Sequence, residues 1–142
     1  MRKTEFRVGD WINRIDINYP YAVRVVGVEL VNRAKDKYVV YVDNMHDAII
    51  NLYIDEVEPI PITEENLIKN GFVLEKDGYV YYPIEGNKEQ DYIAISFRHN
   101  GEVRYVEVNF TNKCQCLYKT IKYIHELQHI LNDCKIGKKI EL

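Results

Sequence analysis

Short stretches rich in β-branched and aromatic residues, separated by polar turns, recur along most of the chain. Three of them lie at 6–12, 21–32 and 38–42, and a fourth short strand is expected at 48–54. Short strands at intervals of about 8–12 residues are typical of small barrels and strongly bent sheets. Residues 1–60 therefore predict a small β-module, and an SH3-like barrel with Trp11 in its core is the expected form.

A proline-containing connector follows this module. Each proline disfavours the α conformation for the residue before it, so 58–62 is expected to be extended. Thr63 is a suitable N-cap, and the two glutamates after it fill the first turn, where the helix dipole favours carboxylates. Gly71 stands where a left-handed residue commonly ends a helix. We therefore expect a short helix between Thr63 and Gly71.

Four antiparallel strands are expected after this helix. Asp77-Gly78 and Asn100-Gly101 are strong hairpin-turn signals, and each lies between two β-rich stretches. The segment 91–98 alternates between apolar and more polar residues, as a half-buried strand does. The segment 103–110 returns in the same way, with Val106, Val108 and Phe110 on one face.

A long C-terminal helix is expected at 113–133. At 100° per residue one face carries an apolar stripe that includes Leu117, Ile121, Ile124, Leu127, Leu131 and Cys134. The tail, 136–142, is expected to add an edge strand. The predicted fold class is α+β, with a β-module at 1–60 and a second region at 61–142 that carries the short helix, four antiparallel strands and the long helix.

Composition narrows the classes of function. The 142 residues include 19 basic and 22 acidic side chains, and the net charge is −3. The basic residues are scattered, whereas duplex-binding domains carry a clustered basic patch. No secretory signal and no apolar run of about 18 residues is visible, so no membrane association is expected. The three cysteines are an odd number and predict reduced thiols and a cytoplasmic location.

One motif in the expected C-terminal helix has a catalytic meaning. His125, Glu126 and His129 match H-E-x-x-H, in which two histidines four residues apart hold a zinc ion and the glutamate activates a water. A third ligand is not evident, because the extended motif has Asn132 and Lys135 at its further conserved positions. On the expected helix both histidines lie on the solvated flank. We therefore favour a non-enzymatic role and keep a zinc-dependent hydrolase as the alternative.

The tyrosines suggest a second kind of site. The chain has twelve of them, and tyrosine is enriched both in strands and at protein interfaces. Tyr79, Tyr81, Tyr82 and Tyr92 are candidates for an exposed partner-binding patch on one sheet. The competing interpretation is that these tyrosines only flank the core of the sheet.

Three stretches together resemble a known sequence family. They are RVGDWI at 7–12, EPIPITEENL at 58–67 with Gly71-Phe72, and YIHELQ at 123–128. Their order and spacing are similar to those of small proteins from Bacteroides-type gut bacteria, their phages and their mobile elements. The resemblance implies provenance, a host cytoplasm if the protein is phage-encoded, and no particular activity. It also implies that the position of His129 is commonly asparagine in similar proteins.

These observations favour a small phage- or mobile-element-associated accessory protein that binds another macromolecule, most simply a protein. The leading interpretation involves no cofactor, since no complete catalytic constellation and no phosphate-binding loop is visible in the sequence. Two alternatives stay open: the zinc-dependent hydrolase, with zinc held by His125 and His129, and a nucleic-acid-binding protein that acts through the β-module.

Overall fold

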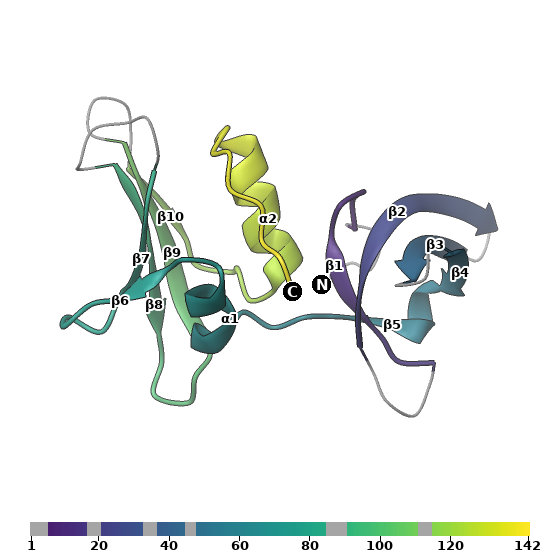
Figure 1. Ribbon diagram of the computed structural model, residues 1–142, viewed down its shortest axis with the longest axis horizontal. Helices are drawn as coiled ribbons and strands as arrows, with labels where there is room; N and C mark the ends of the chain where they lie inside the picture. The colour runs from purple at the N-terminus through teal and green to yellow at the C-terminus, as the bar shows by residue number, and fades with distance from the viewer. Residues whose placement is uncertain (1–5, 17–20, 33–36, 45–47, 85–90, 111–114) are drawn as a thin grey trace. The chain divides into compact units, whose positions relative to one another are not determined.

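The computed structural model describes residues 6–16, 21–32, 37–44, 48–84, 91–110 and 115–142. The chain divides into two compact units: the first consists of Met1–Ile60 and Leu142, and the second of Pro61–Glu141. Each unit is built on one antiparallel sheet of five strands (Figure 1). No helix in these ranges is long and apolar enough to cross a membrane.

The first unit is a meander of strands followed by a short return strand. The strands run in the order β4-β3-β2-β1-β5 across the sheet. Their bounds are β1 Trp11–Arg14, β2 Tyr21–Asn32, β3 Lys37–Asn44, β4 Ala48–Tyr53 and β5 Val57–Pro59, with a 3₁₀ helix at Ile54–Glu56 before β5.

One face of this sheet carries the core of the first unit. The core consists of apolar side chains that alternate along the strands, which is the pattern of a sheet buried on one face. Its members are Phe6, Ile12, Val23, Val25, Val40, Val42, Leu52 and Val57.

The prediction of an SH3-like barrel is wrong, because the described strands form an open sheet with β4 and β5 as its two edges. β5 is three residues long and ends at Pro59, which has no N–H to donate to a further strand. The expected core position of Trp11 is wrong as well. Neighbouring residues of a strand face opposite ways, so Ile12 enters the core while Trp11 is half-buried on the other face under Arg24, whose Cζ lies 5.1 Å from the Trp11 ring centroid.

The second unit contains both α-helices. Its strands run in the order β10-β9-β8-β7-β6 across the sheet. The bounds are α1 Glu64–Lys69, β6 Val73–Leu74, β7 Val80–Pro83, β8 Tyr92–Phe97, β9 Val103–Asn109, β10 Gln115–Tyr118 and α2 Ile124–Asp133.

The local signals for α1 and for the two hairpins are confirmed. Thr63 Oγ1 accepts a hydrogen bond from the Asn66 N–H at 3.1 Å, which caps α1. Gly71 has φ +86°, and the N–H groups of Gly71 and Phe72 bond back to the last turn of α1, as in a Schellman motif. Gly78 and Gly101 also have φ +86° in the β6–β7 and β8–β9 turns.

The prediction of a long C-terminal helix is wrong, and the predicted fold class is wrong with it. Residues 115–118 form strand β10, paired with β9 through Cys116↔Val108, and α2 begins only at Ile124. Leu117, expected in the apolar stripe of the helix, is 54% exposed on β10. Apolar spacing over a short segment does not separate a strand from a helix, and here pairing with β9 decides. The described chain is therefore mostly β, with two short helices, and not α+β.

The C-terminal tail is held by side chains and does not form the expected edge strand. Asn70 Nδ2 donates to the Glu141 carbonyl at 2.9 Å, and its Oδ1 accepts from the Glu141 N–H at 2.7 Å. Gln128 Oε1 accepts from the Ile140 N–H at 2.7 Å, and its Nε2 donates to the Lys138 carbonyl at 3.2 Å. Two amide side chains therefore provide the bonds that a neighbouring strand otherwise provides.

Candidate functional site

The two faces of the second sheet have different roles. One face is fully buried and carries Val80, Ile93, Ile95, Val106 and Val108, none of which is more than 1% exposed. The segment around α2 lies on this face. The Tyr118 hydroxyl is 4.0 Å from the Sγ of Cys134, the C-cap of α2, and Lys138 Nζ lies 5.6 Å from the Tyr82 ring centroid. The opposite face of the sheet carries a different set of side chains.

Four tyrosines meet on that opposite face. The centroids of the Tyr79 and Tyr81 rings are 6.0 Å apart, those of Tyr79 and Tyr105 are 6.1 Å apart, and those of Tyr81 and Tyr92 are 5.4 Å apart. All four side chains are half-buried. We call this group, Tyr79, Tyr81, Tyr92 and Tyr105, the tyrosine face.

Strand register extends this surface across the whole sheet. Tyr81 pairs with Val73 on one side and with Ala94 on the other, Ala94 pairs with Glu107, and Glu107 pairs with Leu117. Paired residues of antiparallel strands share a face, so these five side chains form one row over all five strands. Val73 and Leu117, at its two ends, are 53% and 54% exposed.

Hydrogen bonds hold three of the four rings of the tyrosine face. The Tyr81 hydroxyl donates to Asp77 Oδ2 at 2.7 Å, and the hydroxyls of Tyr79 and Tyr105 bond to each other. Arg104 donates to Ser96 Oγ at 2.7 and 3.0 Å, and its Cζ lies 5.3 Å from the Tyr105 ring centroid. The aromatic surface is therefore arranged before any partner arrives.

Neighbouring carboxylates and burial raise the pKa of three tyrosines of the tyrosine face. The hydrogen bond to Asp77 raises the pKa of Tyr81, and burial and the charge of Glu107 add to this. Burial and then Glu107 raise the pKa of Tyr92, and the hydrogen bond with Tyr79 is the main cause that raises the pKa of Tyr105, with Glu107 contributing. The charge of Glu107 thus contributes to the raised pKa of all three tyrosines. Glu107 itself accepts a hydrogen bond from the side-chain amide of Gln115.

The structure brings together three of the four predicted tyrosines. Tyr82 is on the other face of the sheet, where its ring lies 5.0 Å from that of Phe72 and under Lys138. The reason is the two-residue period of a strand, which turns Tyr81 and Tyr82 in opposite directions. Tyr105 and Glu107 were not among the predicted site residues, although their alternation with Val106 and Val108 places them on the side of the tyrosine face.

The H-E-x-x-H motif has a structural role at its first two positions. His125 is completely buried, and its ring stacks on that of Tyr123, with centroids 5.9 Å apart. The prediction that both histidines face solvent is therefore wrong for His125, while His129 is half-buried with its ring edge-on to that of His125. A helical wheel gives only the direction of a side chain, and the burial of His125 depends on neighbours such as the Tyr123 ring that stacks on it.

Glu126 is engaged at the start of α2. Its Oε1 accepts hydrogen bonds from the N–H groups of Lys122 and Tyr123, both at 3.1 Å, which is the glutamate half of a capping box. Within the described ranges, no three side chains of the His, Cys, Asp and Glu types are grouped so that they can hold a metal. These residues do not fit the donor set of a catalytic zinc, which needs three protein ligands and a glutamate turned toward the metal-bound water.

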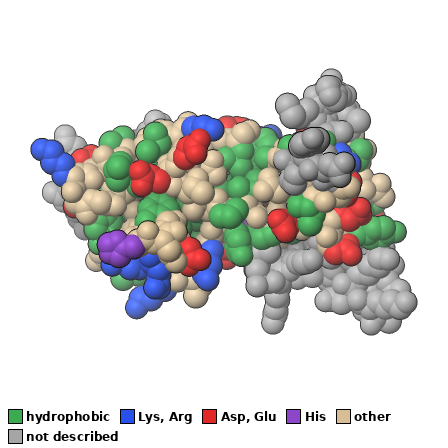
Figure 2. All heavy atoms as spheres, turned by 90° about the horizontal axis from the view of Figure 1, so that it is seen from below, with side chains coloured by type: hydrophobic (Ala, Val, Ile, Leu, Met, Phe, Trp, Pro, Cys, Tyr) green, Lys and Arg blue, Asp and Glu red, His purple; other side chains and the backbone are tan. Residues whose placement is uncertain are grey.

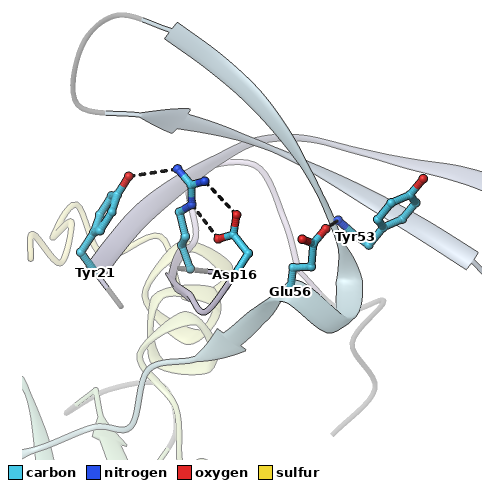
Figure 3. A network of polar contacts seen from close by, with 5 residues as sticks. Asp16, Tyr21, Tyr53 and Glu56 are labelled. Atoms are coloured by element: carbon cyan, nitrogen blue, oxygen red, sulfur yellow. Dashed lines mark hydrogen bonds and ion pairs between the residues drawn. The ribbon is translucent and has the colours of Figure 1, made fainter. Parts of the chain in front are cut away.

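In the first unit, the polar side chains of one charged cluster bond to one another. Arg14 makes a bidentate contact with Asp16, through Nε at 2.7 Å and Nη2 at 2.8 Å, and its Nη1 donates to the Tyr21 hydroxyl at 3.0 Å (Figure 3). The hydrogen bond from Arg14 lowers the pKa of Asp16. The same view shows Glu56 bound to the N–H of Tyr53, where it caps the 3₁₀ helix. Both sets of contacts stabilise connecting segments of the first sheet.

Comparison with known proteins does not add a family to this description. No model of a protein family, no curated protein and no solved structure matches the chain.

Proposed function

We propose that this protein is an accessory module that binds another protein through the tyrosine face of its second sheet. The observation that carries the proposal is a group of four half-buried tyrosines, three of them held by hydrogen bonds, on a sheet face whose opposite side already carries the core. The opposite face already supplies an apolar core, with Val80, Ile93, Ile95, Val106 and Val108 at most 1% exposed, so the tyrosine rings lie outside that core.

Tyrosine suits such a surface for physical reasons. Its ring offers a large contact area with only two side-chain torsions to order, and aromatic residues are enriched at the energetic centres of interfaces. Ordering these rings in advance reduces the entropy lost on binding. The exposed Val73 and Leu117 at the ends of the central row add apolar area.

A protein partner is favoured over a nucleic acid by the charges at this surface. Binding of single strands combines aromatic stacking with a positively charged groove. Here Asp77 and Glu107 lie among the rings, and the cation Arg104 is engaged with Ser96 and Tyr105. On the face drawn in Figure 2, basic and acidic side chains are interspersed with hydrophobic ones over the described surface.

Site-specific photo-crosslinking tests the proposal in a Bacteroides-type cell, the host that the sequence resemblance predicts. A benzoylphenylalanine replaces Tyr92 in one variant and Glu64, exposed on α1, in the control. We expect a defined protein to be crosslinked from position 92 and not from position 64. The same set of proteins captured from both positions contradicts the proposal.

The affinity for the crosslinked protein then measures the contribution of the rings. Tyr81→Thr and Tyr92→Thr keep a β-forming residue and remove the aromatic surface, so each is expected to weaken binding about tenfold or more. Tyr53→Thr, at an exposed tyrosine of β4, is the control and should leave the affinity unchanged. A cytoplasmic setting and a phage or mobile-element origin stay predictions of the sequence.

A further inference from the structure

We propose that the tyrosine face receives lysine or arginine side chains of its partner, so that the partner contributes an extended basic segment. This inference rests on the proposed function, because it names the chemistry of the protein that the tyrosine face binds. Three features of the described residues carry it: the arrangement of the rings, the carboxylates among them, and a cation already bound to one of the rings.

The rings form a corner that suits a cation. Tyr81 and Tyr92 stand at 71° to each other with centroids 5.4 Å apart, so they present two walls at nearly right angles. A cation within about 6 Å of a ring centroid is attracted by the negative face of the ring, and several rings around one cation are a known way to bind ammonium groups.

The chain itself shows that this surface accepts a guanidinium. Arg104, the residue before Tyr105 on β9, places its Cζ 5.3 Å from the Tyr105 ring centroid while it donates to Ser96 on β8. Tyr79, Tyr81 and Tyr92 continue the same ring cluster, and the structure gives no such contact for them among the described residues. A partner arginine at Tyr81 and Tyr92 repeats a contact that the sheet already makes once.

The charges at this surface complement a cation. Among the residues that the structure describes, the carboxylates of Glu75, Asp77 and Glu107 and the cations of Lys76 and Arg104 lie at or beside the tyrosine face. Glu107 accepts one hydrogen bond, from Gln115, and a carboxylate can accept several, so it keeps capacity for a partner.

Apolar positions beside the corner accept the stems of long cationic side chains. Val73 and Leu117 are exposed in the same row as Tyr81 and Glu107, and lysine and arginine bury their methylene stems along such surfaces. The same carboxylates disfavour an acidic segment or a phosphate backbone at this place.

Titration of the full chain with defined peptides, followed by the amide resonances, tests the inference. The probes are a twelve-residue peptide of alternating Arg and Thr, its twin of alternating Glu and Thr, and the oligonucleotide dT12. We expect the Arg-Thr peptide alone to shift Tyr81, Tyr92 and Glu107 in a saturable way, and to bind more weakly as salt rises.

Two variants of equal charge sharpen this test. Glu107→Gln should weaken binding of the Arg-Thr peptide about fivefold, the order expected for losing one charge contact near aromatic rings. Glu64→Gln removes the same charge from exposed α1 and should leave the binding unchanged. The inference is overturned if the Arg-Thr peptide does not bind, if the Glu-Thr peptide or dT12 binds the same residues equally well, or if both variants weaken binding alike.

The two proposals fail separately. If Tyr92→Thr weakens binding of the crosslinked partner while Glu107→Gln and added salt do not, the protein-binding function holds and the basic segment is wrong. If position 92 captures no specific protein, the protein-binding function is wrong, whatever the peptides do.

Discussion

At the scale of single residues, buried polar side chains show how firmly parts of this chain are held. Asn70 is 5% exposed and makes three hydrogen bonds, to the Asn66 carbonyl and to both backbone groups of Glu141. A buried amide of this kind joins α1 to the tail, which has no regular structure of its own. Removing it leaves backbone groups near the tail without partners.

Asn70→Ala is therefore expected to lower the free energy of unfolding by about 2–3 kcal/mol, the cost of leaving buried polar groups without hydrogen bonds. Urea denaturation measures this change. Asn51→Ala, at an exposed position of β4, should change stability by no more than about 0.5 kcal/mol. Equal losses for the two variants contradict the role given to Asn70.

A second residue-scale prediction concerns alkaline pH. Burial, followed by the neighbouring Cys134, raises the pKa of Tyr118 to about 12. The unfolded phenol ionises near pH 10. The folded chain thus binds this proton more tightly, so the related stability is complete below about pH 10 and is lost as the pH rises toward about 12. Tyr118→Phe should lose less stability than the wild type between pH 9 and 11.

Chemical denaturation at about pH 9 and about pH 11 measures how much stability each variant loses between them. Tyr53→Phe is the matched control because Tyr53 is 48% exposed, and it should follow the wild type. The explanation fails if Tyr118→Phe and the wild type lose stability in parallel.

At the scale of elements, the ends of α2 explain both its length and the motif that it carries. The helix begins where Glu126 accepts the N–H groups of Lys122 and Tyr123. It ends where the Ile136 N–H bonds to the Leu131 carbonyl at 2.8 Å, with Lys135 at φ +58° between them. The glutamate of H-E-x-x-H is thus explained by capping.

Glu126→Ala is expected to destabilise the protein by about 1 kcal/mol through loss of the cap, whereas Glu126→Gln should retain most of the stability, because glutamine serves the same capping position. Thermal and urea unfolding compare the two variants. If the alanine and glutamine variants are equally stable, the carboxylate is not a cap.

Lys135 occupies a left-handed position at which a residue with a Cβ is disfavoured by about 1 kcal/mol. Lys135→Gly should therefore raise the free energy of unfolding by about 0.5–1 kcal/mol. Lys139→Gly, at an exposed position in the tail, should not be stabilising. A destabilised Lys135→Gly contradicts the backbone argument.

At the scale of the whole molecule, the chain contains two compact units, each with its own sheet. Within the second unit α1, the five strands, α2 and the tail are joined by hydrogen bonds between segments distant in sequence, such as Asn70 to Glu141 and the Ile62 N–H to the Lys122 carbonyl. The tyrosine face belongs entirely to this unit.

Residues 61–142 alone are expected to fold with a cooperative urea transition, because the buried face of their sheet and its covering segment lie within this range. The amide resonances of Tyr81, Tyr92 and Glu107 should match those of the full chain. A fragment without a cooperative transition, or with shifted resonances on the tyrosine face, contradicts the independence of this unit.

The sequence predicted those parts of the fold that depend on local chemistry. Thr63 caps α1 through its own hydroxyl, and Gly71, Gly78 and Gly101 adopt positive φ where L-residues are strained. Each of these features is decided within a few residues. Three tyrosines of the candidate site were also named, because tyrosine is enriched in strands and at protein interfaces.

Only the tertiary structure decided the features that depend on distant partners. Residues 115–118 are a strand because β9 lies beside them, and His125 is buried with its ring stacked on that of Tyr123. Tyr105 joins Tyr79 because β7 and β9 both pair with β8, which lies between them. Hydrogen-bond pairing and burial are non-local, and one segment can satisfy either a helix or a strand until its neighbours select between them.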